Sequence, residues 1–155
     1  MSGSLQAYLA TAIPKSQADL EAAFLRLPED RRTWSPQGGA RTAADMLAEC
    51  ALLNGSVADM LRDRAFPGQF DMEAYQKAKG ALAQDLASLP VRLRENTARA
   101  VEALAAVPDA DLANEIEMPW GPMALSQIMA YPYWNMCYHE GQINYIASML
   151  GCLTP

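Results

Sequence analysis

The chain of 155 residues has one histidine, His139, and three cysteines, Cys50, Cys137 and Cys152, with no CxxC spacing. An odd cysteine count without that spacing is typical of reduced thiols, so we expect a cytoplasmic protein. The stretch HEGQI begins like the zinc-protease motif HExxH, but Ile143 stands where the second histidine ligand is required. GxSxG, Walker and GxGxxG motifs are also absent. These absences exclude the common hydrolase and nucleotide-binding signatures.

Positive charge is scarce, since 12 Lys and Arg face 18 Asp and Glu, giving a net charge of -6 and a sequence pI of about 4.7. A phosphate backbone favours a clustered basic surface, so this balance predicts no nucleic-acid partner. Residues 118–138 lack charge altogether, yet Pro119, Pro122 and Pro132 interrupt them. A spanning helix rarely carries such prolines together, so we also expect no membrane partner.

The composition favours helices. Hydrophobic residues make up 51% and charged ones 19%, as in a globular chain, and we expect one domain spanning 1–155. Alanine, leucine and methionine are abundant and runs of β-branched residues are few. Helical patterns cover about 4–27, 43–64, 72–106 (divided by Pro90) and 124–150. EIEM and MAL, on either side of PWGP, could form a small hairpin. The fold class is therefore all-α, a four-helix bundle with long crossover connections.

Polar residues line up on two of the predicted helices. Asn135, His139 and Gln142 follow i, i+4, i+7 spacing and share one face of the last helix. On the second helix, Glu49 borders the apolar arc, whereas Asp45 falls on the other side. A carboxylate beside a core needs a partner. An imidazole from a facing helix would satisfy it, and so would a metal held between the two helices.

These residues resemble a known family, the DinB/YfiT-like proteins, which are four-helix bundles assigned as metalloenzymes. NMCYHEGQI at 135–143 matches the family's HxxxHxGQI except that Asn135 replaces the first histidine. TAADMLAE at 42–49 matches its Ser/Thr-x-x-Glu/Asp-x-Leu-x-His pattern, with Glu49 at the histidine position. LPEDRRTWSP at 27–36 also looks like the Leu-Pro…Trp segment that follows the family's first helix.

The resemblance implies a divalent metal held by Glu49, Asn135 and His139 in a cleft between the second and last helices. The metal would be nickel, zinc, iron or manganese. It also implies a small-molecule substrate, with a low-molecular-weight thiol used in S-transfer or isomerisation. Glutamate is an acceptable ligand and asparagine a weak one, so this set favours harder ions and lower affinity than three imidazoles.

Two readings of the site stay open. In the first, Glu49 and His139 ligate the metal of a thiol-dependent enzyme. In the second, His139 is a core residue hydrogen-bonded to Glu49, and the chain is a metal-free bundle that binds a small molecule or a protein. From Met118 onward only His139 and Glu140 can carry side-chain charge. This nearly uncharged final third predicts a homodimer in which the last helix contributes surface.

Overall fold

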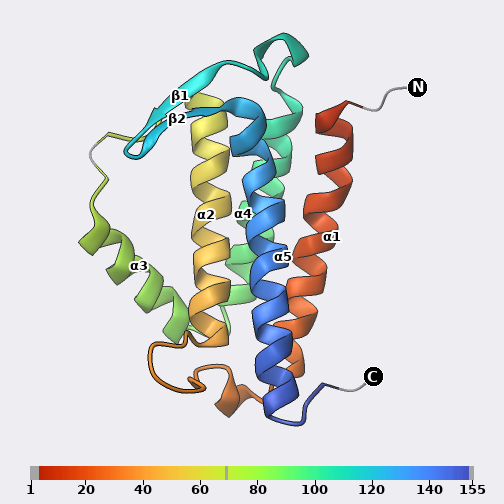
Figure 1. Ribbon diagram of the computed structural model, residues 1–155, viewed down its shortest axis with the longest axis vertical. Coiled ribbons are helices and arrows are strands. Elements are labelled where there is room, and N and C mark those ends of the chain that lie inside the picture. The colour runs from red at the N-terminus through yellow and green to blue at the C-terminus, as the bar shows by residue number, and fades with distance from the viewer. Residues whose placement is uncertain (1–3, 69, 154–155) are drawn as a thin grey trace.

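The fold is built from helices that match the periodic segments of the sequence. A computed structural model describes residues 4–68 and 70–153. Its main elements are α1 (Leu5–Arg26), α2 (Ala43–Asp63), α3 (Met72–Gln84), α4 (Leu89–Ala105), β1 (Glu115–Met118), β2 (Gly121–Ala124) and α5 (Leu125–Met149). Figure 1 shows α1, α2, α4 and α5 side by side as a bundle, with α3 splayed away from it. The predicted all-α four-helix bundle is therefore confirmed.

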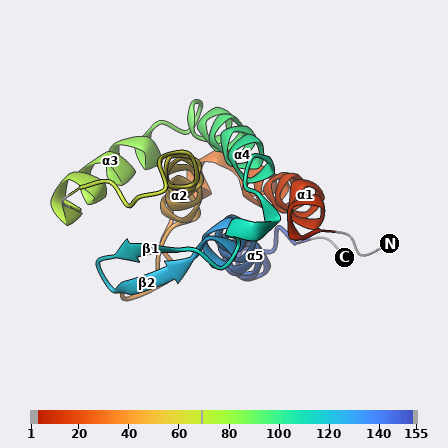
Figure 2. The ribbon, with the colours of Figure 1, turned by 90° about the horizontal axis from the view of Figure 1, so that it is seen from above.

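The helix directions explain why the connections are long. In Figure 1, α2 and α4 run upward, whereas α1 and α5 run downward. Two parallel neighbours need a crossover, and α3 lies within the connection from α2 to α4. Seen from above, α3 lies outside the bundle beyond α2 (Figure 2). A second long connection carries the hairpin of β1 and β2, paired antiparallel from Glu115 opposite Ala124 to Met118 opposite Gly121.

Local signals set the helix ends. The Thr42 side chain accepts a hydrogen bond from the Asp45 backbone N–H and so caps α2. The stretch 72–106 divides before Pro90, which lies in the first turn of α4. Proline is tolerated there because the first helical N–H groups have no intrahelical partner. The break therefore falls slightly earlier than the proline itself.

The core fills the space between the bundle helices. α2 packs against α4 and α5, and α1 packs against the same two helices. Phe24, Leu47, Leu93 and Met136 are among the large side chains fully buried there. α5 is covered on one side only, because its Trp134, Tyr138 and Tyr145 are 54%, 53% and 69% exposed. No helix in the described ranges is long and apolar enough to cross a membrane.

Candidate functional site

A carboxylate and an imidazole meet between α2 and α5. The Nε2 atom of His139 lies 3.0 Å from Oε1 of Glu49. The imidazole is buried, and the Glu49 side chain keeps 23% of its surface exposed. Apolar residues on the facing sides of α2 and α5 bring the two helices together, so these side chains meet at the edge of the core. Sequence reasoning placed this pair together, and the structure does the same.

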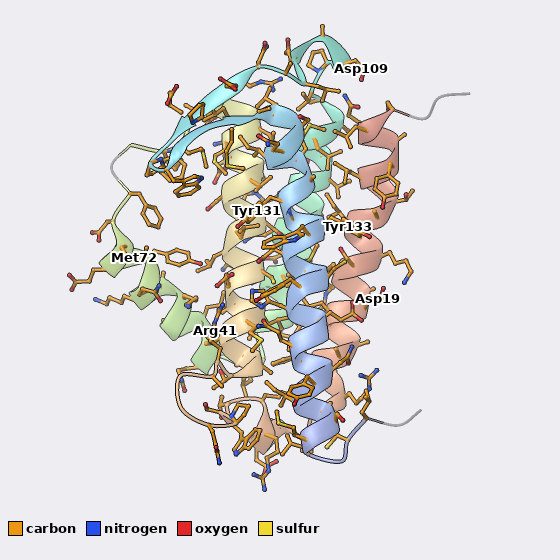
Figure 3. All side chains as sticks on the ribbon, viewed as in Figure 1. Asp19, Arg41, Met72, Asp109, Tyr131 and Tyr133 are labelled. Carbon is orange, nitrogen blue, oxygen red and sulfur yellow. The ribbon has the colours of Figure 1, made fainter. Side chains whose placement is uncertain are left out.

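The second oxygen of Glu49 is also engaged. Arg41, which lies between the lower ends of α2 and α3 (Figure 3), places Nη2 2.8 Å from Oε2 of Glu49. Its Nε atom hydrogen-bonds to Asp45. Lys79 of α3 reaches the other oxygen of Asp45 at 3.0 Å. Arg41, Asp45, Glu49, Lys79 and His139 thus form one polar cluster, which joins α2 to both α3 and α5.

The partners of Glu49 keep it ionised. The hydrogen bond from His139 contributes most to lowering the pKa of the Glu49 carboxyl to about 2. Burial opposes this shift, and the positive charge of Arg41 adds to it. Burial also raises the pKa of Asp45, but hydrogen bonds from Lys79 and Arg41 outweigh it and leave that pKa below its ordinary value. Both carboxylates are therefore hydrogen-bond acceptors only.

His139 uses both ring nitrogens within the protein. Because ionised Glu49 can only accept, the Nε2–H of His139 donates to it. On the other side of the ring, Nδ1 lies 2.6 Å from Oε1 of Gln142, one turn further along α5. Two acceptors do not bond, so this hydrogen bond forms either with a second ring proton on Nδ1 or with the Gln142 amide turned so that its N–H donates. The i, i+3 spacing of His139 and Gln142 makes this contact possible. Neither ring nitrogen points its lone pair at an open position.

The side chain of Asn135, the third predicted site residue, contacts Cys50 and not Glu49 or His139. Its side chain is buried, and its Nδ2 donates to the Sγ of Cys50 at 3.4 Å. The Cys50 thiol in turn lies 4.0 Å from the Asn135 backbone oxygen. Burial raises the pKa of the Cys50 thiol far above its ordinary range, so it stays protonated. Asn135 thus belongs to a neutral pair beside the polar cluster.

A resident metal does not fit these donor atoms. A catalytic zinc site takes three protein ligands with free lone pairs. Here Glu49 binds Arg41 and His139, and the amide of Asn135 is directed at sulfur. No group of three or more His, Cys, Asp or Glu that could hold an ion occurs in the part of the chain that the structure describes. The guanidinium also places a positive charge beside Glu49, where a divalent cation would be repelled.

Sequence reasoning missed Arg41 and Lys79 and misplaced Asp45. Asp45 was expected on the outer side of the second helix, yet Arg41 links it to Glu49. Asp45 and Glu49 are spaced i, i+4 on one face of α2, and this signal could have found Asp45. Arg41 precedes the Thr42 N-cap, so its approach to this face depends on the path of the loop before the helix. Lys79 comes from α3, and no local sequence pattern indicates that α3 packs beside α2.

The sequence model of the DinB superfamily matches residues 12–143. The chain belongs to the DinB superfamily. No curated protein matches it by sequence.

Solved structures with the same fold are distant in sequence. YfiT from Bacillus subtilis, described as a probable metal-dependent hydrolase with an unusual four-helix bundle topology, is 14% identical, with a TM-score of 0.79 over 94% of this chain and 87% of its own. The mycothiol-dependent maleylpyruvate isomerase is 12% identical, with a TM-score of 0.72 over 89% of this chain and 60% of its own. Similarity at this level establishes the fold of this DinB-superfamily chain.

A third structure corrects the expectation about nucleic acid. The colibactin self-resistance protein ClbS, in complex with double-stranded DNA, is 15% identical, with a TM-score of 0.66 over 96% of this chain and 97% of its own. The exclusion of a nucleic-acid partner is therefore wrong. It rested on net charge, which sums over the whole surface and does not report where basic side chains gather. In this chain Arg62, Arg64 and Arg99 line one hollow together with Glu102, and each of the three arginines forms an ion pair with an aspartate.

Proposed function

We propose that this DinB-superfamily chain is a metal-independent bundle that binds a small molecule beside the Glu49–His139 pair. The observation that carries the proposal is the engagement of both Glu49 oxygens, by His139 at 3.0 Å and by Arg41 at 2.8 Å. In this arrangement a guanidinium supplies the positive charge that balances Glu49. Because each charged member has a partner, the polar cluster forms a rigid wall for the proposed ligand site.

The surface around the cluster supports a ligand. A groove of about 640 Å³ lies between α5 and the segment before α2, and both Arg41 and Gln142 line it. Burial, with a smaller contribution from the Glu49 charge, raises the pKa of Tyr75 of α3 to about 12. One cluster member, Arg41, and Gln142, which contacts His139, thus border open space. Concave sites with a few placed polar groups are the usual form of small-molecule sites.

A metal-dependent enzyme is the second candidate. Its support is the short Glu49–His139 distance, together with the description of YfiT as a probable metal-dependent hydrolase. The mycothiol-dependent isomerase adds a precedent for a thiol in this fold. Displacing Arg41 from Glu49 would free two protein ligands, Glu49 and His139, with Asn135 as a weak third. We rank this candidate second because that set is one strong ligand short of an ordinary catalytic site.

Metal content separates the two candidates. The full chain is purified without a histidine tag or chelator, and its nickel, zinc, iron and manganese are measured by elemental analysis, with His139→Ala alongside. We expect far less than one ion per chain in both proteins. A stoichiometric metal in the parent that His139→Ala loses would overturn the metal-independent proposal in favour of the second candidate.

A further inference from the structure

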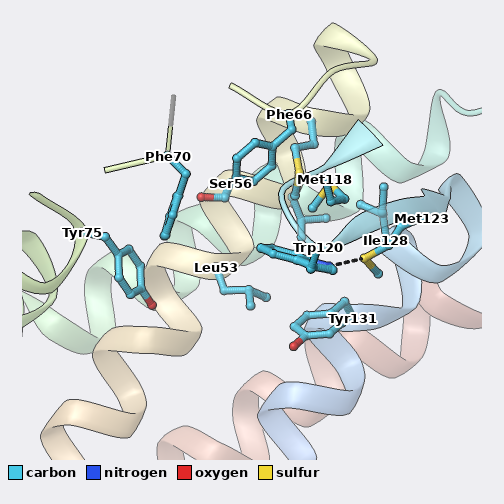
Figure 4. A pocket seen from close by; sticks show the side chains of 12 residues that line it. Leu53, Ser56, Phe66, Phe70, Tyr75, Met118, Trp120, Met123, Ile128 and Tyr131 are labelled. Atoms are coloured by element: carbon cyan, nitrogen blue, oxygen red, sulfur yellow. Dashed lines mark hydrogen bonds between the residues drawn. The ribbon is translucent and has the colours of Figure 1, made fainter. Parts of the chain in front are cut away.

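A separate hollow lies higher on the bundle than the polar cluster. It has a volume of about 230 Å³ and is enclosed by α2, α3, α5, the hairpin and the segment that precedes α3 (Figure 4). We call it the aromatic pocket, after the side chains that line it, which include Phe66, Phe70, Tyr75, Trp120 and Tyr131. None of the described lining residues carries a charge. Neither the predicted site residues nor the family motifs extend into it.

The aromatic rings form a continuous wall. The centroid of Trp120 in the hairpin lies 6.0 Å from that of Phe66, with the rings edge to face. Phe66 lies 5.9 Å from Phe70, and Phe70 lies 5.8 Å from Tyr75 of α3. Such edge and tilted contacts stabilise each ring in place. The wall is therefore formed before any ligand arrives.

The rim of the aromatic pocket exposes large apolar side chains. Trp120 is 66% exposed and Phe70 is 43% exposed. The indole Nε1–H of Trp120 is 3.4 Å from the Met123 sulfur, a weak acceptor. A cluster of exposed aromatic residues around a concavity marks a binding site more often than chance exposure does. The enclosure by five elements and the small volume favour a small molecule over a peptide or a helix.

The polar groups of the pocket are few and neutral. They are the hydroxyls of Ser56, Tyr75 and Tyr131. The Tyr75 phenol points toward α2 (Figure 4), and burial together with the Glu49 charge raises its pKa to about 12. It therefore stays protonated and can donate or accept one hydrogen bond. A charged ligand would lose its hydration here with no opposite charge on the lining.

We propose that the aromatic pocket binds a neutral, flat aromatic molecule of one or two rings, with a hydrogen-bonding substituent directed at Tyr75. The size follows from the volume, since a buried cavity of about 150 Å³ accommodates one benzene ring. The flat shape follows from the ring wall, and the neutrality follows from the uncharged lining. The inference goes beyond the proposed function, because it assigns a second small-molecule site apart from the groove beside Glu49 and His139.

Calorimetry with 2-naphthol, which is neutral, two-ringed and hydroxylated, tests this site on the full chain. We expect saturable binding that weakens at least tenfold in Phe70→Ala and in Trp120→Ala, whose side chains are exposed and lie outside the buried core. Tyr8→Ala, a 56% exposed aromatic on α1 outside both the aromatic pocket and the groove, should bind like the parent. Tyr75→Phe should weaken 2-naphthol severalfold and leave naphthalene unchanged, because only the hydroxyl contact is lost.

Several results would overturn the inference. One is 2-naphthol binding that is absent, or that Phe70→Ala and Trp120→Ala leave unchanged. Another is tighter binding of 1-naphthoate or tetramethylammonium, which would assign the pocket to a charged ligand. A dimer that Trp120→Ala alone converts to a monomer would show that a second copy fills it. Each of these leaves the metal content of the parent untouched, so failure here is distinguishable from failure of the metal-independent proposal.

Discussion

Nε2 of His139 lies 3.0 Å from Oε1 of Glu49, although the two residues are 90 positions apart in the chain. This contact joins α2 to α5 at the edge of the core, and Arg41 completes it from the solvent side. The two positions that the resemblance assigns to metal ligands here bind one another. A site of this kind has consequences for stability, for pH dependence and for metal affinity.

Glu49→Gln should destabilise the fold. The amide removes the negative charge that Arg41 and His139 share. The half-buried Arg41 guanidinium then keeps Asp45 as its remaining ionic partner. We expect the free energy of unfolding to fall by about 1–3 kcal/mol. Urea denaturation measures it. Glu102→Gln, an exposed carboxylate on α4, should change stability by less than about 0.5 kcal/mol and serves as the control. Equal effects at the two positions would contradict the role of Glu49.

The Glu49 contribution should depend on pH in one direction. Its folded-state pKa of about 2 lies below the ordinary value of 4.5, so the ionised form favours the folded state. The contribution is fully present above about pH 4.5 and is lost as the pH falls toward about 2. The stability difference between the parent and Glu49→Gln should therefore shrink between about pH 5 and about pH 3. A difference that stays constant over this interval would argue against an ionised, hydrogen-bonded Glu49.

Gly55 of α2 should resist substitution more than Gly80 of α3. A Cβ on Gly55 would lie 2.8 Å from Nδ2 of Asn96, which donates to the Ala51 backbone oxygen at 2.8 Å. Gly55→Ala must displace this buried amide, and we expect a loss of about 1–3 kcal/mol. Nothing lies within 4 Å of a Cβ on Gly80, so Gly80→Ala should raise stability by about 0.5–1 kcal/mol through helix propensity. Thermal unfolding of both variants checks the signs.

The exposed face of α5 should associate with a second copy. Trp134 stacks on Tyr138 with ring centroids 5.5 Å apart, and both are about half exposed on a segment without charge. Each chain has a net charge of -6, so two copies repel one another least when they meet through surfaces that carry no charge. We expect a dimer by sedimentation that Trp134→Ser weakens and that Leu25→Ser, an exposed apolar residue of α1, does not. A monomeric parent at micromolar concentration would contradict this prediction.

Sequence periodicity was sufficient for the fold. Apolar spacing, the Thr42 cap and Pro90 placed the long helices within a few residues of their observed ends, because each signal acts over one or two turns. The Lys79–Asp45 contact ties α3 to α2, and no local pattern encodes such a pairing between helices. The cytoplasmic location stays a prediction, since it concerns the cell rather than the fold.

The site was predictable in part. The motifs brought Glu49 and His139 together, since the apolar stripes of α2 and α5 fix which faces meet. They could not show that Asn135 would turn to Cys50, or that Arg41 would occupy the second Glu49 oxygen. Those choices depend on side-chain rotamers and on charges that compete for the same oxygen. The metal-ligand role of Glu49, Asn135 and His139 therefore stays a prediction of the resemblance.

Calorimetric titration of Zn²⁺ tests the metal-independent account most directly. The parent and the double variant Glu49→His/Asn135→His are compared, because the variant restores three imidazoles at the family's ligand positions and frees Arg41 from Glu49. The account predicts no saturable binding by the parent and one ion bound per chain of the variant, with affinity falling below about pH 6 as imidazoles protonate. Saturable, stoichiometric binding by the parent that His139→Ala abolishes would contradict it.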